Sequence, residues 1–198
     1  MTSLQTKLLR HPGLCDAAKE LGKHLDLWIE ATPPAQLVEF VDQASLALLC
    51  DAFMQVGGCE GTVWLLDEKA GDLVAVFNSG VDADSLIGFR QPLGQGIISL
   101  VFVQQQPYCE NDIQASEGHD DTLDRKISKH TTAMIAVPFY FGFGLRGVVS
   151  CVQLEEAAGP RDGFSFGDVE TLSRVSNIIE RLINESLFSS ALGFSDGI

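Results

Sequence analysis

The stretch that decides the fold is residues 93–112, LGQGIISLVFVQQQPYCEND. It opens with a turn that contains Gly94 and Gly96, continues as an apolar run, and ends after a proline in a short acidic segment. Two closely spaced glycines allow a sharp turn, and amides at the start of a following helix can hold an anion. A turn that only reverses the chain accounts for the same residues. The apolar run alone fits a strand as well as a helix, and the Gln-Gln-Gln-Pro that follows it favours a short helix over 97–104, with a short strand or extended segment over 108–112.

A second pattern, AMIAVPFYFGFGLRGVVSCVQL at residues 133–154, predicts two strands joined by a tight turn at Gly142-Phe143-Gly144. After a loop, Ser165 and Asp168 have the spacing of a capping box, with Asp in place of the usual Glu. They start the last predicted helix, whose apolar stripe is Val169, Leu172, Val175, Ile179, Leu182 and Leu187.

The first sixty residues predict two helices. Apolar residues at helical spacing place one over 14–29. Thr32 is a plausible N-cap for the next helix, and Pro33 suits its first position. This second helix ends near Gly57-Gly58, and its expected stripe is Leu37, Val41, Ala44, Leu48 and Ala52.

The residues that follow predict strands. Runs over 62–66 and 73–77 flank a turn and form an expected hairpin, and 89–93 adds a third strand. Hairpin-connected strands among helices predict an α+β protein with an antiparallel sheet.

Composition excludes several classes of protein. The 198 residues fit one domain with helical extensions, and a net charge of −14 disfavours binding to nucleic acid. No apolar run is long enough to span a membrane. The five cysteines are scattered without zinc spacing, and such free thiols are typical of a reducing cytoplasm.

Together these motifs resemble the GAF family of small sensory domains. The shared positions, in order, are Gly94, Gly96, Ile97, Val101, Pro107, Asp112, Ala136-Val137-Pro138, Gly147-Val148-Val149, Phe164 and Asp168. The resemblance covers about residues 36–188. It divides the chain into a helical extension at 1–33, a GAF domain at 34–189 and a tail at 190–198.

The resemblance implies a central antiparallel sheet of five to six strands. The terminal helices would cover one face, and a ligand pocket would lie on the other, as in GAF and PAS-like folds. Residues 94–112 would form one wall of the pocket, and 114–134 the lid and second wall. The expected ligand-binding residues are Arg90, Gly94, Gly96, Ile97, Cys109, Asp112, His130, Thr132 and Met134. Arg90 is equally suited to a surface salt bridge, and Asp112 to capping the next segment.

Departures from the family's patterns weigh against its better-known activities. Cyclic-nucleotide-binding members carry Asn-Lys where this chain has Gln153-Leu154. Bilin-binding members attach the chromophore through a Cys that is often followed by His, and this sequence has no Cys-His pair. Free methionine sulfoxide reductases carry thiols where this chain has Ile98-Ser99 and Thr131-Thr132, so we expect no enzyme. An iron site that senses nitric oxide would need Cys109, Asp112 and a histidine, His119 or His130, to meet.

The resemblance implies a cytoplasmic regulatory domain that binds an unidentified small molecule and signals through its terminal helices. Ligand binding would order residues 114–131 and shift the population of helix packings. A homodimer would form through helices 34–56 and 165–189, extended by 14–29. The effector would be a partner protein in trans or another part of a longer regulator. The alternative is a dimerisation or interaction module with a degenerate pocket.

Overall fold

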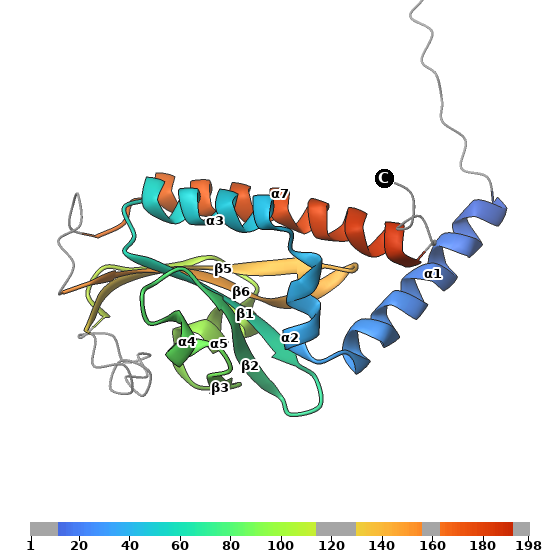
Figure 1. The fold of residues 1–198 in the computed structure, drawn as a ribbon, viewed down its shortest axis with the longest axis horizontal. Coiled ribbons are helices and arrows are strands. Elements are labelled where there is room, and N and C mark those ends of the chain that lie inside the picture. The colour runs from blue at the N-terminus through green and yellow to red at the C-terminus, as the bar shows by residue number, and fades with distance from the viewer. Residues whose placement is uncertain (1–11, 114–129, 156–162, 192–198) are drawn as a thin grey trace, which may run out of the picture.

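A computed structural model describes residues 12–113, 130–155 and 163–191 (Figure 1). The helices are α1 (Pro12–Ala31), α2 (Pro34–Leu37), the 3-10 helix η1 (Val38–Phe40), α3 (Gln43–Gln55), α4 (Ala83–Leu86), α5 (Gly96–Gln104) and α7 (Phe166–Ala191). The strands are β1 (Glu60–Asp67), β2 (Asp72–Asn78), β3 (Arg90–Pro92), β4 (Tyr108–Glu110), β5 (Thr131–Phe141) and β6 (Gly144–Leu154).

The six strands form one antiparallel sheet in the order β3-β2-β1-β6-β5-β4. The predicted α+β class and the five to six strands are therefore confirmed. The centre of the sheet is the pairing of β1 with β6, where Thr62 lies opposite Ser150. It joins the hairpins β1–β2 and β5–β6, which are far apart in the sequence.

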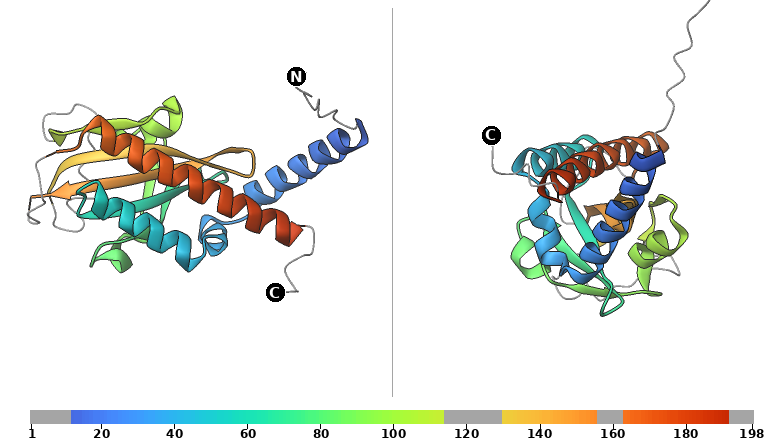
Figure 2. Two further views of the ribbon diagram at one scale, coloured as in Figure 1. Left: turned by 90° about the horizontal axis from the view of Figure 1, so that it is seen from above. Right: turned by 90° about the vertical axis from the view of Figure 1, so that its right-hand side faces the viewer.

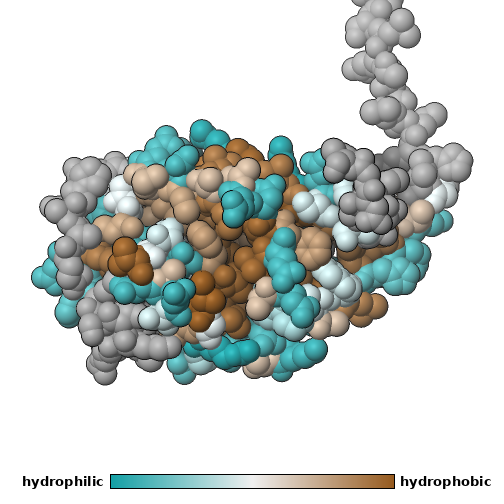
Figure 3. Space-filling view, in the orientation of Figure 1, coloured by the Kyte–Doolittle hydropathy of each residue, from teal (hydrophilic) through white to brown (hydrophobic). Residues whose placement is uncertain are grey.

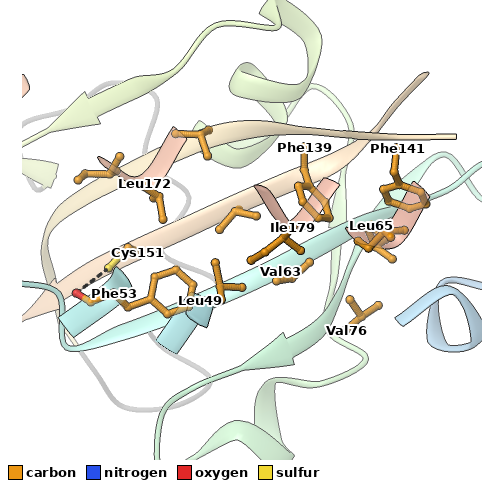
Figure 4. Packing of buried hydrophobic residues seen from close by; sticks show 14 of the residues in the cluster. Leu49, Phe53, Val63, Leu65, Val76, Phe139, Phe141, Cys151, Leu172 and Ile179 are labelled. Atoms are coloured by element: carbon orange, nitrogen blue, oxygen red, sulfur yellow. Dashed lines mark hydrogen bonds between the residues drawn. The ribbon is translucent and has the colours of Figure 1, made fainter. Parts of the chain in front are cut away.

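Helices α3 and α7 lie side by side on one face of the sheet (Figures 1 and 2). This α3/α7 face holds the larger hydrophobic core, in which Phe53 of α3 and Ile179 of α7 meet strand residues such as Val63 and Phe139 (Figure 4). Gly61 makes room for the Phe53 ring, because a Cβ at this position would overlap it. The predicted packing of the first and last helices of the domain on one face is thus observed.

The opposite face, here called the α5 face, holds a second apolar cluster. Ile97, Ile98 and Val101 of α5 pack there against Trp64 of β1 and other strand residues. Strand side chains alternate between the two clusters, as the pleat of a sheet requires. Because both faces are apolar, β1 and β6 are buried along most of their length.

The prediction of one continuous helix over 34–56 is wrong. The chain forms α2 and η1, then breaks and restarts as α3, because Asp42 is the N-cap and accepts a hydrogen bond of 2.6 Å from the Ser45 amide. The Thr32 hydroxyl is no cap and donates instead to the Trp28 carbonyl of α1 at 2.6 Å. The buried residues of α3 are Ser45, Leu49, Ala52 and Phe53, which differ from the expected stripe in all but Ala52.

The predicted tight turn and the predicted cap are both present. Gly142 and Phe143 have φ values of 54° and 66°, the backbone of a two-residue turn that matches the twist of the hairpin. The Asp168 carboxylate accepts a 2.7 Å hydrogen bond from the Ser165 amide, as in a capping box. In α7, however, Ile183 is buried and Leu182 is 38% exposed, so Leu182 does not belong to the core stripe.

Two side chains of α7 cover the part of β5 that β4 does not pair. Pairing with β4 covers only residues 134–136 of β5. Beyond it, Pro138 has no N–H, and the Tyr140 and Gly142 amides donate to Glu180 Oε1 and Asn184 Oδ1, both at 2.7 Å. The exposed length of strand edge is thereby closed to other strands.

Glu180 makes the stability of the fold depend on pH. Burial raises the pKa of its carboxyl to about 7, and the Tyr140 amide and Arg181 oppose the rise. Between pH 4.5 and 7 the folded state therefore binds more protons than the unfolded state, so the free energy of unfolding falls as pH rises.

Replacing Glu180→Gln keeps a hydrogen-bond acceptor for Tyr140 and removes this titration. We expect the variant to match the wild type near pH 4.5 and to be more stable by about 1 kcal/mol at pH 8, after allowing for solvent screening. Urea denaturation across this range measures the difference. A difference in the free energy of unfolding that does not change with pH would contradict the raised pKa of Glu180.

Candidate functional site

A row of polar side chains crosses the α5 face of the sheet. Asn78, Thr62 and Ser150 are cross-strand neighbours on β2, β1 and β6. Asn78 Nδ2 donates to Thr62 Oγ1 at 2.9 Å, and Trp64 Nε1 donates to Ser150 Oγ at 3.0 Å. All of these side chains are buried. Polar groups placed this far from water are satisfied by one another, which fixes their orientations.

Glu60 extends this row at the start of β1 and is 6% exposed. Its carboxylate lies against Gly80, where an added Cβ would overlap it. The Gly80 amide in turn donates to Asn78 Oδ1 at 2.7 Å. We call Glu60, Thr62, Asn78 and Ser150 the polar cluster. It lies at the end of the sheet where the chain leaves at Ile113 and returns at His130; the predicted lid, residues 114–129, lies outside the described residues.

The polar cluster borders the second apolar cluster, which we call the apolar floor. Trp64 connects the two, because its ring packs in the apolar floor while its N–H donates to Ser150 of the polar cluster. Met134 of β5 is half-buried against the apolar floor, which also contains the buried Ile97 of α5. The α5 face thus combines a packed apolar cluster with a few buried hydrogen-bonding groups, and small-molecule sites are lined by the same two kinds of group.

The predicted glycine turn is present, but one of its amides is already used. Gly94 and Gly96 have φ values of 89° and 72°, which the turn requires of them. The Gly94 N–H donates to the hydroxyl of Ser99, a buried residue of the first turns of α5. This bond fastens the loop onto the helix and leaves that amide no role in holding an anion.

Arg90 forms a salt bridge at the edge of the sheet. Its guanidinium donates to Asp67 at 2.7 Å and to Asp72 at 3.3 Å, and its side chain is 47% exposed. The hydrogen bond from Arg90 lowers the pKa of Asp67. The structure therefore places Arg90 in a surface ion pair of the β1–β2 hairpin, away from the polar cluster.

Cys109 points to the α3/α7 side of the sheet. It is opposite Ile135, a residue of the larger core, and its sulfur lies 3.9 Å from the Phe164 carbonyl. Partial burial of the sulfur, then Glu110 and Asp168, raise the pKa of this thiol. The structure thus separates Cys109 from the other expected ligand-binding residues, and its environment disfavours a thiolate.

The remaining predicted residues lie near the ends of the undescribed segment. Asp112 is exposed, and its amide donates to Glu110 Oε1 at 3.1 Å. Thr132 is exposed and donates to the Gln153 carbonyl at 3.2 Å. His130 is exposed, and its carbonyl accepts from the Glu155 amide at 2.9 Å. Within the described ranges, no three His, Cys, Asp or Glu side chains gather closely enough to hold a metal ion.

Sequence reasoning missed the polar cluster. The signal was the alternation of polar and apolar residues in Glu60-Gly61-Thr62-Val63 and the single serine in the apolar run of β6. Each is unremarkable alone, and only the register of β1 against β2 and β6 brings them into one row.

Comparisons with known proteins place this architecture. No protein-family model matches the sequence, and no curated protein matches it. Among solved structures, the GAF domain of a phosphoenolpyruvate-protein phosphotransferase from Coxiella burnetii is similar with a TM-score of 0.58 and 17% identity, covering 88% of this chain and 95% of its own. The GAF-B domain of DevS from Mycobacterium smegmatis is similar with a TM-score of 0.56 and 14% identity, covering 74% of this chain and 94% of its own.

Free methionine-R-sulfoxide reductase from Neisseria meningitidis, in complex with its substrate, is also similar. Its TM-score is 0.57 and its identity 17%, over 96% of this chain and 99% of that one. The chain is therefore a domain of the GAF fold. At these identities the likeness shows the fold alone, and regulatory domains and reductases share it. None of the described helices is both long and apolar enough to cross a membrane.

The hydrogen bond between Asn78 and Thr62 in the polar cluster can be tested by measuring the free energy of unfolding of a variant. Thr62→Val removes the acceptor of Asn78 Nδ2 and leaves a buried amide without that partner, so we expect a loss of about 1–3 kcal/mol. Urea denaturation measures it. The matched control is Thr132→Val, an exposed position on β5, where the loss should stay below about 0.5 kcal/mol. Equal losses of unfolding free energy in Thr62→Val and Thr132→Val would contradict the burial of the polar cluster.

Proposed function

We propose that this protein is a regulatory domain that senses a small molecule on the α5 face and signals through its helices. The observation that supports it best is the polar cluster beside the apolar floor. Burying polar groups in a sheet costs free energy unless each finds a hydrogen-bond partner, whereas apolar residues would pack there without needing partners. In a ligand-binding site, a few polar groups of this kind fix the orientation of the bound molecule.

Signalling would work by population shift. The strands that carry the polar cluster also carry, on their other side, the residues on which α3 and α7 pack. A ligand that contacts Thr62 and Ser150 better in one arrangement of β1 and β6 favours the helix packing that goes with it. In this proposal the shifted helices act on a partner protein or on another part of a longer regulator.

Catalysis of methionine sulfoxide reduction is the alternative that the fold raises. That chemistry needs a thiolate in the pocket and a second thiol within reach. On the α5 face Ile98 lies in the apolar cluster, and Ser99 is bonded to Gly94. Burial raises the pKa of Cys151, on the other face, far above its usual range. These positions support a binding domain over an enzyme.

A cyclic nucleotide is disfavoured on similar grounds. Gln153 stands where cyclic-nucleotide-binding members carry Asn, but it serves the fold. Its Nε2 donates to the Gly57 carbonyl at 2.9 Å, and its Oε1 accepts from the Gly163 amide at 2.7 Å. The side chain fastens the end of α3 to the segment before α7.

Native mass spectrometry of the purified full chain tests the ligand. We expect a co-purified small molecule that is lost or reduced at least about tenfold in Ser150→Ala and retained in the control Ser173→Ala, which makes the same change on α7 at the opposite face of the sheet. Turnover of free methionine sulfoxide by the wild type would overturn the binding proposal in favour of catalysis. A ligand that both variants retain would place the site elsewhere.

A homodimer through the terminal helices completes the proposal. Met54 of α3 and Ile178 and Leu182 of α7 are exposed by 66%, 42% and 38%, so the outer side of the helix pair carries apolar surface. Further apolar surface lies between α3 and the β1–β2 hairpin in the view of Figure 3. The scattered free thiols fit a cytoplasmic location.

Charge on this helix surface should separate the subunits. We expect size exclusion with light scattering to give twice 21.4 kDa for the wild type and 21.4 kDa for Ile178→Glu with Leu182→Glu, because a buried carboxylate pair opposes association. The control is Val103→Glu, an exposed apolar residue on α5, on the other face of the sheet. A wild-type mass of 21.4 kDa would refute the dimer.

A further inference from the structure

Helix α1 is attached to the rest of the described structure at one end. It extends away from the sheet in Figure 1 and in the left view of Figure 2. No other described element shares extensive backbone contact with it. Its attachment therefore depends on a small number of side chains in its last two turns.

The polar part of the attachment is Arg146 of β6, whose side chain is 9% exposed. Its Nε donates to the Phe141 carbonyl at 3.3 Å, and its Nη2 to the Gly142 carbonyl at 3.2 Å, both at the β5–β6 turn. The same guanidinium pairs with Asp26 of α1 and lies 4.0 Å from Glu68 in the β1–β2 turn. Arg146 thus joins α1 to the tips of both hairpins.

The partners of Arg146 are divided unequally between α1 and the domain. If α1 leaves, the guanidinium keeps two carbonyls and Glu68. Asp26 is already 44% exposed and returns to water. Breaking a buried ion pair is costly when it strands a charge, and here neither charge is stranded. The pair directs where α1 docks without making docking irreversible.

The apolar part of the attachment is also limited. Ile29 is 3% exposed and fits against Gly142, where an added Cβ would overlap it. Trp28 meets Phe40 edge to face with ring centroids 5.4 Å apart, yet Trp28 remains 42% exposed. A groove of about 530 Å³ separates α1 from the last turns of α7, lined by Leu21, His24, Leu25, Trp28, Phe40, Leu187 and Ser190. Such incomplete packing is unlike a protein core.

We propose that α1 is a releasable latch, closed by the Arg146–Asp26 pair and the seat of Ile29 on Gly142. Its closed position depends on the relative placement of the β1–β2 and β5–β6 turns, which are the far ends of the strands that carry Thr62 and Ser150. Release uncovers the apolar residues Leu25, Ile29 and Phe40. The latch follows from the contacts alone, while its use as the output of ligand sensing rests on the proposed function.

Hydrogen exchange of the full chain, followed by mass spectrometry, tests the latch. Asp26→Asn removes the charge that pairs with Arg146. We expect amides in the second half of α1 to exchange about 5–10-fold faster, while those of α3 and α7 are unchanged, since local opening is separate from global unfolding. The matched control is Asp16→Asn on the same helix, whose side chain is 78% exposed and lies 3.9 Å from Lys19. It should not change exchange.

A second variant, Ile29→Ala, weakens the apolar seat and should produce the same selective loss of protection. Unchanged exchange of α1 in both variants would overturn the latch, and so would a joint loss of protection in α1 and α7, which would make α1 part of the core. Wild-type α1 that exchanges as fast as an unfolded peptide would also overturn it, because no closed state would exist. None of these outcomes depends on finding a ligand, so the latch and the proposed function can fail separately.

Discussion

The structure depends on the antiparallel pairing of β1 with β6. This pairing joins two hairpins from distant parts of the chain and produces the two faces of the sheet. Gly147 allows it, because a side chain there would overlap the Trp64 carbonyl on the neighbouring strand. Successive residues of β1 then point alternately to the two faces, so Val63 enters the core under α3 and α7 while Thr62 and Trp64 face α5.

In the proposed function, this arrangement places ligand binding and the helix response on opposite sides of the same strands. The α5 face carries polar groups that a core does not need, and the α3/α7 face is a densely packed apolar layer (Figure 4). A packed layer responds to a change in strand position by switching between packings, because it has little free volume. The ends of those strands hold α1 through Arg146, so the helical extension is connected to the same sheet.

The fold was largely predictable because its signals are local. The β5–β6 hairpin follows from branched residues around a glycine turn, and the start of α7 from the spacing of Ser165 and Asp168. The failure at residues 34–56 has a physical cause: helical periodicity continues through Val41 and Asp42, but Asp42 caps a new helix more favourably than it continues the old one. In α7 the buried residue is Ile183 and not the predicted Leu182. The helix sequence does not specify from which direction the sheet approaches α7, so it could not distinguish these neighbours.

The candidate site was less predictable. Residues expected from the loops were partly dispersed, since Arg90 is held by Asp67 and Asp72, and Cys109 lies on the other face of the sheet. The sequence by itself determined the strands, the glycine turns, the Ser165–Asp168 cap and the likeness to the GAF family, all of which depend on residues close together in the chain. Only the tertiary structure decided that Asn78, Thr62 and Ser150 form one buried row, and that Arg146 reaches Asp26. Those relations depend on strand register and helix placement, which are set by packing over the whole chain.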